Sequence, residues 1–137
     1  MTDVAFHFGA PHKLEYAGRL LRKAVGRGAR LVVFAPQDTL RRLDSQLWAQ
    51  SPTEFLAHCV DGDPSAARSP VVLASRLHTG LPADSVLVNL SDVVPEGYGH
   101  FGRVIEVVSH DEEDRVAARG RWKHYAQPVS YTHLRAH

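Results

Sequence analysis

The sequence has 137 residues, of which 44% are hydrophobic and 23% are charged, values typical of one soluble globular domain. Sixteen Lys and Arg residues against fifteen Asp and Glu residues give a net charge of +1, which argues against a general attraction to nucleic acid or to a charged membrane. The one cysteine, Cys59, excludes an internal disulfide, and the lack of both a long apolar run and a secretory signal leads us to expect a cytoplasmic protein.

The first part of the sequence alternates between strand and helix patterns. Residues 4–8 alternate along the chain with the period of two that is typical of a strand. Residues 12–25 place apolar side chains three and four positions apart, which predicts an amphipathic helix. Residues 30–35 are a compact apolar run, typical of a strand buried on both faces. A second helix is predicted from Asp38, as its N-cap, to Trp48.

The second part continues this alternation after a turn-rich segment. Short apolar runs at residues 71–74, 85–90 and 101–108 predict three more strands. Residues 111 to about 126 predict a last helix, because acidic side chains in its first turn complement the helix dipole. Strands that alternate with helices at these spacings predict an α/β domain whose mostly parallel sheet is covered on both faces.

The sequence contains no motif for nucleotide binding, metal binding or catalysis. The loop after the first predicted strand, GAPHKLE, matches neither GxGxxG nor GxxxxGK[ST], the two glycine-rich phosphate motifs. The nine histidines have no metal-ligand spacing such as HExxH, and a GxSxG nucleophile motif is absent. We therefore expect no cofactor, no metal and no catalytic residue. A small α/β enzyme or nucleotide-binding protein, with a site built from residues such as His7, His12 and Asp38, is the alternative.

Two groups of large side chains have unusual positions. Arg115, Arg119 and Trp122 lie at i, i+4 and i+7 of the last predicted helix and therefore share one face. Such a face fits a carboxylate with an adjacent apolar tip, although the pattern alone favours a solvated basic face. Trp48 and Phe55 flank a predicted helix end, where an ordinary core turn is the simpler interpretation.

The joint order of several segments resembles the chi subunit of the bacterial DNA polymerase III holoenzyme. The segments are LDSQLW (43–48), SPTEFLAH (51–58), VLVNL (86–90), VIEVV (104–108) and RGRWKHY (119–125). The resemblance covers roughly residues 3–126 and implies a Rossmann-like, three-layer α/β fold that binds no nucleotide. It also implies a non-catalytic accessory subunit of the replicative clamp-loader assembly, located at the replisome and in contact with DNA only indirectly.

The resemblance further implies two protein partners. One is the psi subunit, which ties chi to the clamp loader, and the residues that match its interface are Leu47, Trp48, Pro52 and Phe55. The other is the acidic C-terminal tail of the single-stranded DNA-binding protein, which ends in a hydrophobic residue and a free carboxylate. The residues that match the tail site are Val108, Arg115, Arg119 and Trp122.

The last ten residues do not resemble the ending of this family. We expect a single domain over residues 1–127, followed by an atypical tail, native or foreign, over residues 128–137. No role is assigned to His133, Arg135 or His137.

Overall fold

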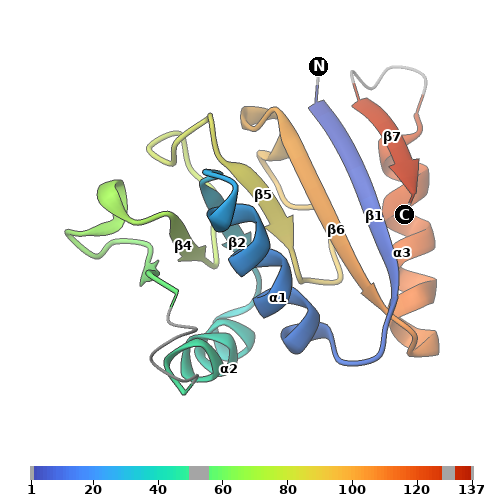
Figure 1. The fold of residues 1–137 in the computed structure, drawn as a ribbon. Helices are drawn as coiled ribbons and strands as arrows, with labels where there is room; N and C mark the ends of the chain where they lie inside the picture. Colours follow the sequence, from blue (N-terminus) through green and yellow to red (C-terminus); the bar gives the residue numbers. More distant parts are fainter. Residues whose placement is uncertain (1, 50–55, 128–131, 137) are drawn as a thin grey trace.

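Figure 1 shows the fold as a computed structural model, which describes residues 2–49, 56–127 and 132–136. Its strands are β1 (Thr2–Ala10), β2 (Leu31–Phe34), β3 (Cys59–Val60), β4 (Val71–Ala74), β5 (Val86–Asn89), β6 (Arg103–Ser109) and β7 (Thr132–Ala136). Its helices are α1 (Lys13–Gly26), α2 (Gln37–Trp48) and α3 (Glu112–Tyr125). Two 3-10 turns, η2 (Ala66–Arg68) and η3 (Tyr98–His100), lie in the loops.

The strands form one sheet in the order β3-β4-β2-β5-β6-β1-β7, and each neighbouring pair in it is parallel. Parallel neighbours require crossover connections, which explains why strand and helix patterns alternate along the sequence. The predicted α/β fold with a mostly parallel sheet is thus confirmed. The sequence pattern does not predict the two edge strands, the two-residue β3 and the C-terminal β7.

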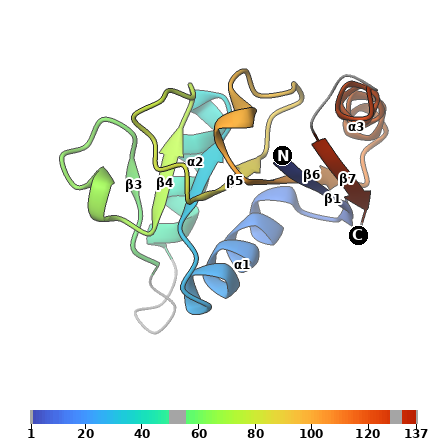
Figure 2. The same cartoon turned by 90° about the horizontal axis from the view of Figure 1, so that it is seen from above.

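Each face of the sheet has its own hydrophobic core. Val33, Val88 and Ile105 lie in register on β2, β5 and β6, and they belong to the core that α1 and α2 cover. The opposite face forms a second core, which includes Ala118 and Tyr125 of α3. Figure 2 shows α1 and α3 on opposite sides of the sheet. Burial on both faces explains the continuous apolar runs of the central strands.

Helix α2 begins slightly earlier than the sequence predicts. Its N-cap is Pro36, so Asp38 lies in the first turn and the prediction of Asp38 as the N-cap is wrong. Asp38 still complements the helix dipole in that position. The buried residues of α2 are Leu40, Leu43 and Leu47, which recur at helical spacing. Leu47 has 0% exposure, whereas its neighbour Trp48 is 58% exposed, because adjacent helical residues point about 100° apart.

Asp114, in the first turn of helix α3, connects this helix to the end of β6 and to the start of α1. The Asp114 carboxylate accepts a hydrogen bond from the Ser109 amide at 2.7 Å and lies 3.2 Å from the Lys13 ammonium of α1. Partial burial of Asp114 opposes ionisation, but the Ser109 hydrogen bond and the Lys13 charge prevail and lower the pKa of this carboxyl group below 3.8. The ionised side chain therefore holds the first turn of α3 against the end of β6.

Replacement of Leu47 and of Trp48 should have very different effects on stability. We expect Leu47→Ala to reduce the free energy of unfolding by about 3 kcal/mol, because it leaves a cavity in the core. Trp48→Ala should reduce it by only about 0.5 kcal/mol, because most of the indole is already in contact with water. Urea denaturation of the two variants measures both values. Equal losses would contradict the placement of Trp48 at the surface.

Replacement of Asp114 should produce a loss of stability that depends on pH. At pH 7, Asp114→Asn should reduce the free energy of unfolding by about 1.5 kcal/mol, because a charged acceptor is lost. A lowered pKa stabilises the fold above the unfolded-state pKa, and this stabilisation disappears as the pH falls through the folded-state pKa. The difference from the parent should therefore shrink below pH 3.8. The exposed neighbour Glu113→Gln is the control and should show little effect at pH 7.

Candidate functional site

A pocket of about 780 Å³ lies between α3 and the ends of β1 and β7, and we call it the α3 pocket. Its basic side chains are His110, Arg115, Arg119 and Lys123. Its apolar side chains include Phe8 from the end of β1, together with Ala118 and Trp122 from α3. The pocket is completed by Gly9 and by Ala136 of β7. It thus combines positive charge on one helix with an aromatic wall contributed by a helix and a strand.

The positive charges of the α3 pocket lie in one row. Arg115, Arg119 and Lys123 are four residues apart along α3 and therefore project from neighbouring turns. Arg115 lies 3.6 Å from Glu112, which is too exposed for strong pairing. Within the described ranges, Arg119 and Lys123 have no ion-pair partner. Like charges at this spacing repel one another by a few tenths of a kcal/mol, so the row favours an anionic ligand.

The aromatic wall is held in place by the core. The ring of Trp122 lies 5.1 Å from the ring of Phe6, and the ring of Phe8 stacks on Phe6 at 5.6 Å. Phe6 is fully buried, whereas Phe8 is 48% exposed. The exposed aromatic surface therefore rests on a side chain that cannot move freely. Such a surface can receive an apolar group without first becoming ordered.

A cluster of buried polar groups, which we call the Glu106 cluster, lies inward of α3. Glu106 of β6 accepts hydrogen bonds from Asn89 Nδ2 at 2.9 Å, from Arg121 Nε at 3.0 Å and from Tyr125 Oη at 2.6 Å. Burial raises the pKa of Glu106, and the Arg121 charge with these hydrogen bonds opposes that effect. Burial and the nearby Glu106 carboxylate also raise the pKa of Tyr125, so its hydroxyl stays a donor.

The structure brings together three of the residues that the sequence assigns to the tail site. Arg115, Arg119 and Trp122 all line the α3 pocket. Val108 has 0% exposure and packs in the core, so it does not contribute to the pocket surface. The reason is its position in β6, which is covered on both faces.

Sequence reasoning misses Phe8 and Lys123, although each leaves a signal. Phe8 is the third member of the alternating row that begins with Val4 and continues with Phe6. An aromatic residue at the end of such a row can pass beyond the covering helix and become exposed. Lys123 continues the four-residue spacing of the two arginines. A search for basic residues at this spacing over the whole helix would have found it.

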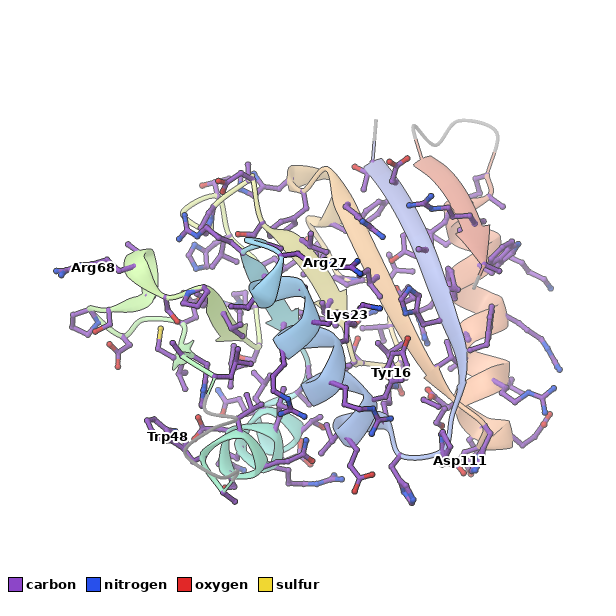
Figure 3. All side chains as sticks on the ribbon, viewed as in Figure 1. Tyr16, Lys23, Arg27, Trp48, Arg68 and Asp111 are labelled. Atoms are coloured by element: carbon purple, nitrogen blue, oxygen red, sulfur yellow. The ribbon has the colours of Figure 1, made fainter. Side chains whose placement is uncertain are left out.

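A second candidate surface lies at the end of α2. Figure 3 shows Trp48 there, and α2 and α3 pack against opposite faces of the sheet. Its ring lies 5.1 Å from the ring of His58, which contacts Asp44 at 2.9 Å and the Leu56 carbonyl at 2.7 Å. His58 is therefore held in place by its own hydrogen bonds, and the exposed indole of Trp48 packs against it. Of the other residues predicted for the psi interface, Leu47 lies in the core, and Pro52 and Phe55 fall outside the described residues.

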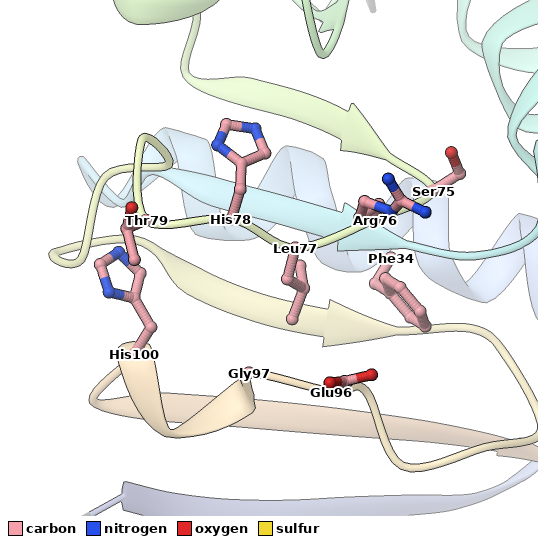
Figure 4. Close-up of a pocket in the computed structure, with 9 residues that line it drawn as sticks. All are labelled: Phe34, Ser75, Arg76, Leu77, His78, Thr79, Glu96, Gly97 and His100. Atoms are coloured by element: carbon pink, nitrogen blue, oxygen red, sulfur yellow. The ribbon is translucent and has the colours of Figure 1, made fainter.

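A polar pocket lies beside the end of β2, and its two histidines form internal contacts. Figure 4 shows Phe34, Arg76 and Glu96 around one part of it and His78 with His100 around another, in a volume of about 620 Å³. His78 contacts Asp61 at 2.8 Å, and His100 donates to the Leu81 carbonyl at 2.7 Å. These histidines are used to hold the loops together.

The alternative enzyme site receives no support from geometry. His7 forms a hydrogen bond with Tyr16, whereas Asp38 lies on α2 at the surface. In the part of the chain that the structure describes, no three His, Cys, Asp or Glu side chains are placed to hold a metal ion. None of the helices in this part is long and apolar enough to cross a membrane.

Comparisons with known proteins agree with the resemblance seen in the sequence. The model of the family described as "DNA polymerase III chi subunit, HolC" matches residues 1–129. The chain is similar to the DNA polymerase III subunit chi of Haemophilus influenzae, with 25% identity over 105 residues, or 75% of this chain and 73% of that protein. It is also similar to the subunit chi of Pseudomonas aeruginosa, with 29% identity over 116 residues, or 84% of this chain and 80% of that protein.

The family match extends from β1 through α3 and ends at residue 129, before β7. It therefore includes both candidate surfaces, apart from β7. These findings show that the chain belongs to the family of DNA polymerase III chi subunits, which are accessory subunits in DNA replication.

Proposed function

We propose that this chain is a non-catalytic bridging subunit, which joins the psi subunit of the clamp loader to the acidic C-terminal tail of the single-stranded DNA-binding protein. The observation that carries this proposal is the α3 pocket, where Arg119 and Lys123 lie beside a supported aromatic wall without an ion-pair partner in the described ranges. Family membership supports the replication context. In this proposal the chain has no cofactor and reaches DNA only through its partner.

The chemistry of the α3 pocket complements the proposed tail. The guanidinium of Arg119 can donate two parallel hydrogen bonds to a terminal carboxylate, a geometry that Lys cannot provide. The apolar last residue of the tail would lie between Phe8 and Trp122. Arg115 and Lys123, one turn away on either side, would attract the preceding acidic residues.

The exposed end of α2 is the proposed site for psi. Trp48 offers a large apolar surface that costs little conformational entropy to bury, which is typical of a residue at the centre of an interface. Pro52 and Phe55 would extend this surface. Leu47, which is buried, would support it from the core without direct contact. Because the sheet separates α2 from α3, both partners could bind at once.

Arg119→Ala should weaken binding of the tail. For a labelled acidic peptide that ends in an apolar residue and a free carboxylate, we expect about a tenfold loss of affinity, because one charge-assisted contact is removed. The affinity of the parent protein should fall as salt rises, and the variant should be less sensitive to salt. Fluorescence anisotropy at several salt concentrations measures both effects. Arg42→Ala, which removes an exposed arginine of α2, is the matched control and should bind like the parent.

Trp48→Ala should weaken binding of psi and leave binding of the tail intact. We expect a loss of about 2 kcal/mol, as for the central aromatic residue of an interface. Calorimetric titration with psi measures this value, and the anisotropy assay measures the tail. Trp122→Ala is the reciprocal control, since it should lose the tail and retain psi. If each variant lost both partners, the assignment of two separate surfaces would be wrong.

A further inference from the structure

Helix α3 has too little apolar surface for packing alone to fix its position. Its buried side chains are Ala118, Arg121 and Tyr125, which supply one methyl group, one guanidinium and one phenol. Trp122 adds a partly buried indole. Interdigitating aliphatic side chains, which normally prevent a helix from rotating or sliding on a sheet, are largely missing from this face. The rings of Trp122 and Tyr125 contact Phe6, and Asp114 attaches the first turn, but a further interaction in the middle of this face can fix the orientation of α3.

The Glu106 cluster supplies that interaction from within the sheet. Arg121 and Tyr125 are four residues apart on α3, and they donate to different oxygens of the Glu106 carboxylate. A single hydrogen bond would allow the helix to turn about it, whereas two bonds from successive turns fix both the rotation and the height of the helix. Asn89 Nδ2, 2.9 Å from both oxygens, holds the carboxylate itself in place.

This arrangement is better suited to setting geometry than to adding stability. A buried ion pair roughly offsets the cost of removing its charges from water, so its net contribution to folding is small. Within the described residues, neither Nη atom of Arg121 has a hydrogen-bond partner, although both are buried. Among the described residues, Glu106 is the only group of opposite charge that Arg121 contacts. A role in orienting α3 would explain why Arg121 is buried.

The residues that face the α3 pocket are direct neighbours of the residues that reach Glu106. Trp122 follows Arg121 in the chain, and Ala118 is both buried and part of the pocket lining. Any rotation of α3 would move the indole away from Phe6 and would turn Arg119 relative to Phe8. The pocket thus keeps its shape only while α3 keeps its orientation.

We propose that Glu106, Arg121 and Tyr125 are positioning residues for the α3 pocket, which hold Arg119 and Trp122 in the arrangement that receives an acidic peptide with an apolar end. This inference rests on the proposed function for its ligand. It assigns a binding role to three buried side chains that do not touch the peptide. It also separates the determinants of peptide affinity from the determinants of stability.

Two variants of the full chain test the proposal. Glu106→Leu combined with Arg121→Met replaces the ion pair by apolar groups and avoids an unpaired buried charge. Tyr125→Phe removes one hydroxyl and retains the ring. Val71→Ala, in the core on the opposite face of the sheet, is the control for a general loss of stability. Each protein is compared with the parent by urea denaturation, by affinity for the labelled peptide at several salt concentrations, and by amide hydrogen exchange.

We expect the double variant to fold and to bind the peptide at least tenfold more weakly, with less dependence on salt. We expect about a threefold loss for Tyr125→Phe and an unchanged affinity for Val71→Ala. Amide exchange over residues 115–122 should become faster in the double variant, while exchange in α1 should not. Parental affinity and salt dependence in the folded double variant would overturn the proposal, as would an equal loss in Val71→Ala.

The remaining outcomes are also decisive. If the double variant does not fold, Tyr125→Phe decides the question, because parental peptide affinity and parental exchange in that variant would overturn the proposal. If the parent protein itself does not bind the peptide, the proposed function fails. The amide exchange of α3, which needs no peptide, then decides whether the cluster orients the helix.

Discussion

A carboxylate enclosed by a protein core must receive its hydrogen bonds from the protein, and Glu106 receives them from a neighbouring strand and from α3. This requirement connects the centre of the sheet to the surface that carries the cationic row. The sheet is rigid because its central strands are covered on both faces. The side chain of Glu106 connects this rigid sheet to α3, a helix that buries few aliphatic side chains. The shape of the α3 pocket is therefore determined by a polar interaction inside the core.

At the carboxyl end of β5, polar side chains form hydrogen bonds with the following loop. In sheets of this type, ligands usually bind where neighbouring strands lead to connections on opposite sides. Here β2 and β5 are neighbours, and the chain leaves them toward opposite edges of the sheet. At this point Asn89 donates to the Val93 carbonyl, and its own oxygen accepts from the amide and hydroxyl of Ser91. Polar groups that could have bound a ligand instead close the loop after β5.

The sequence predicts the central part of the fold and three residues of the α3 pocket lining. Apolar runs such as residues 30–35 predict buried strands because apolar burial dominates folding, and the spacing of Arg115, Arg119 and Trp122 predicts a shared helical face. Val108, which the resemblance assigns to the tail site, lies in the core, and a strand pattern does not show how deeply a residue lies below a helix. The resemblance assigns Leu47 to the psi interface, although its spacing from Leu43 indicates the core. The Glu in VIEVV gave no signal, because its partners come from distant segments.

The position of β1 in the sheet has a consequence for the order of assembly during synthesis. This first strand lies between β6 and β7, which begin at Arg103 and Thr132. A nascent chain must therefore keep an apolar segment unpaired until about a hundred further residues have left the ribosome. Pairing over such a sequence separation is slow, and an unpaired strand invites aggregation. The segment around Val4 and Phe6 is thus exposed to aggregation for longer during synthesis than a strand that pairs with a near neighbour in the sequence.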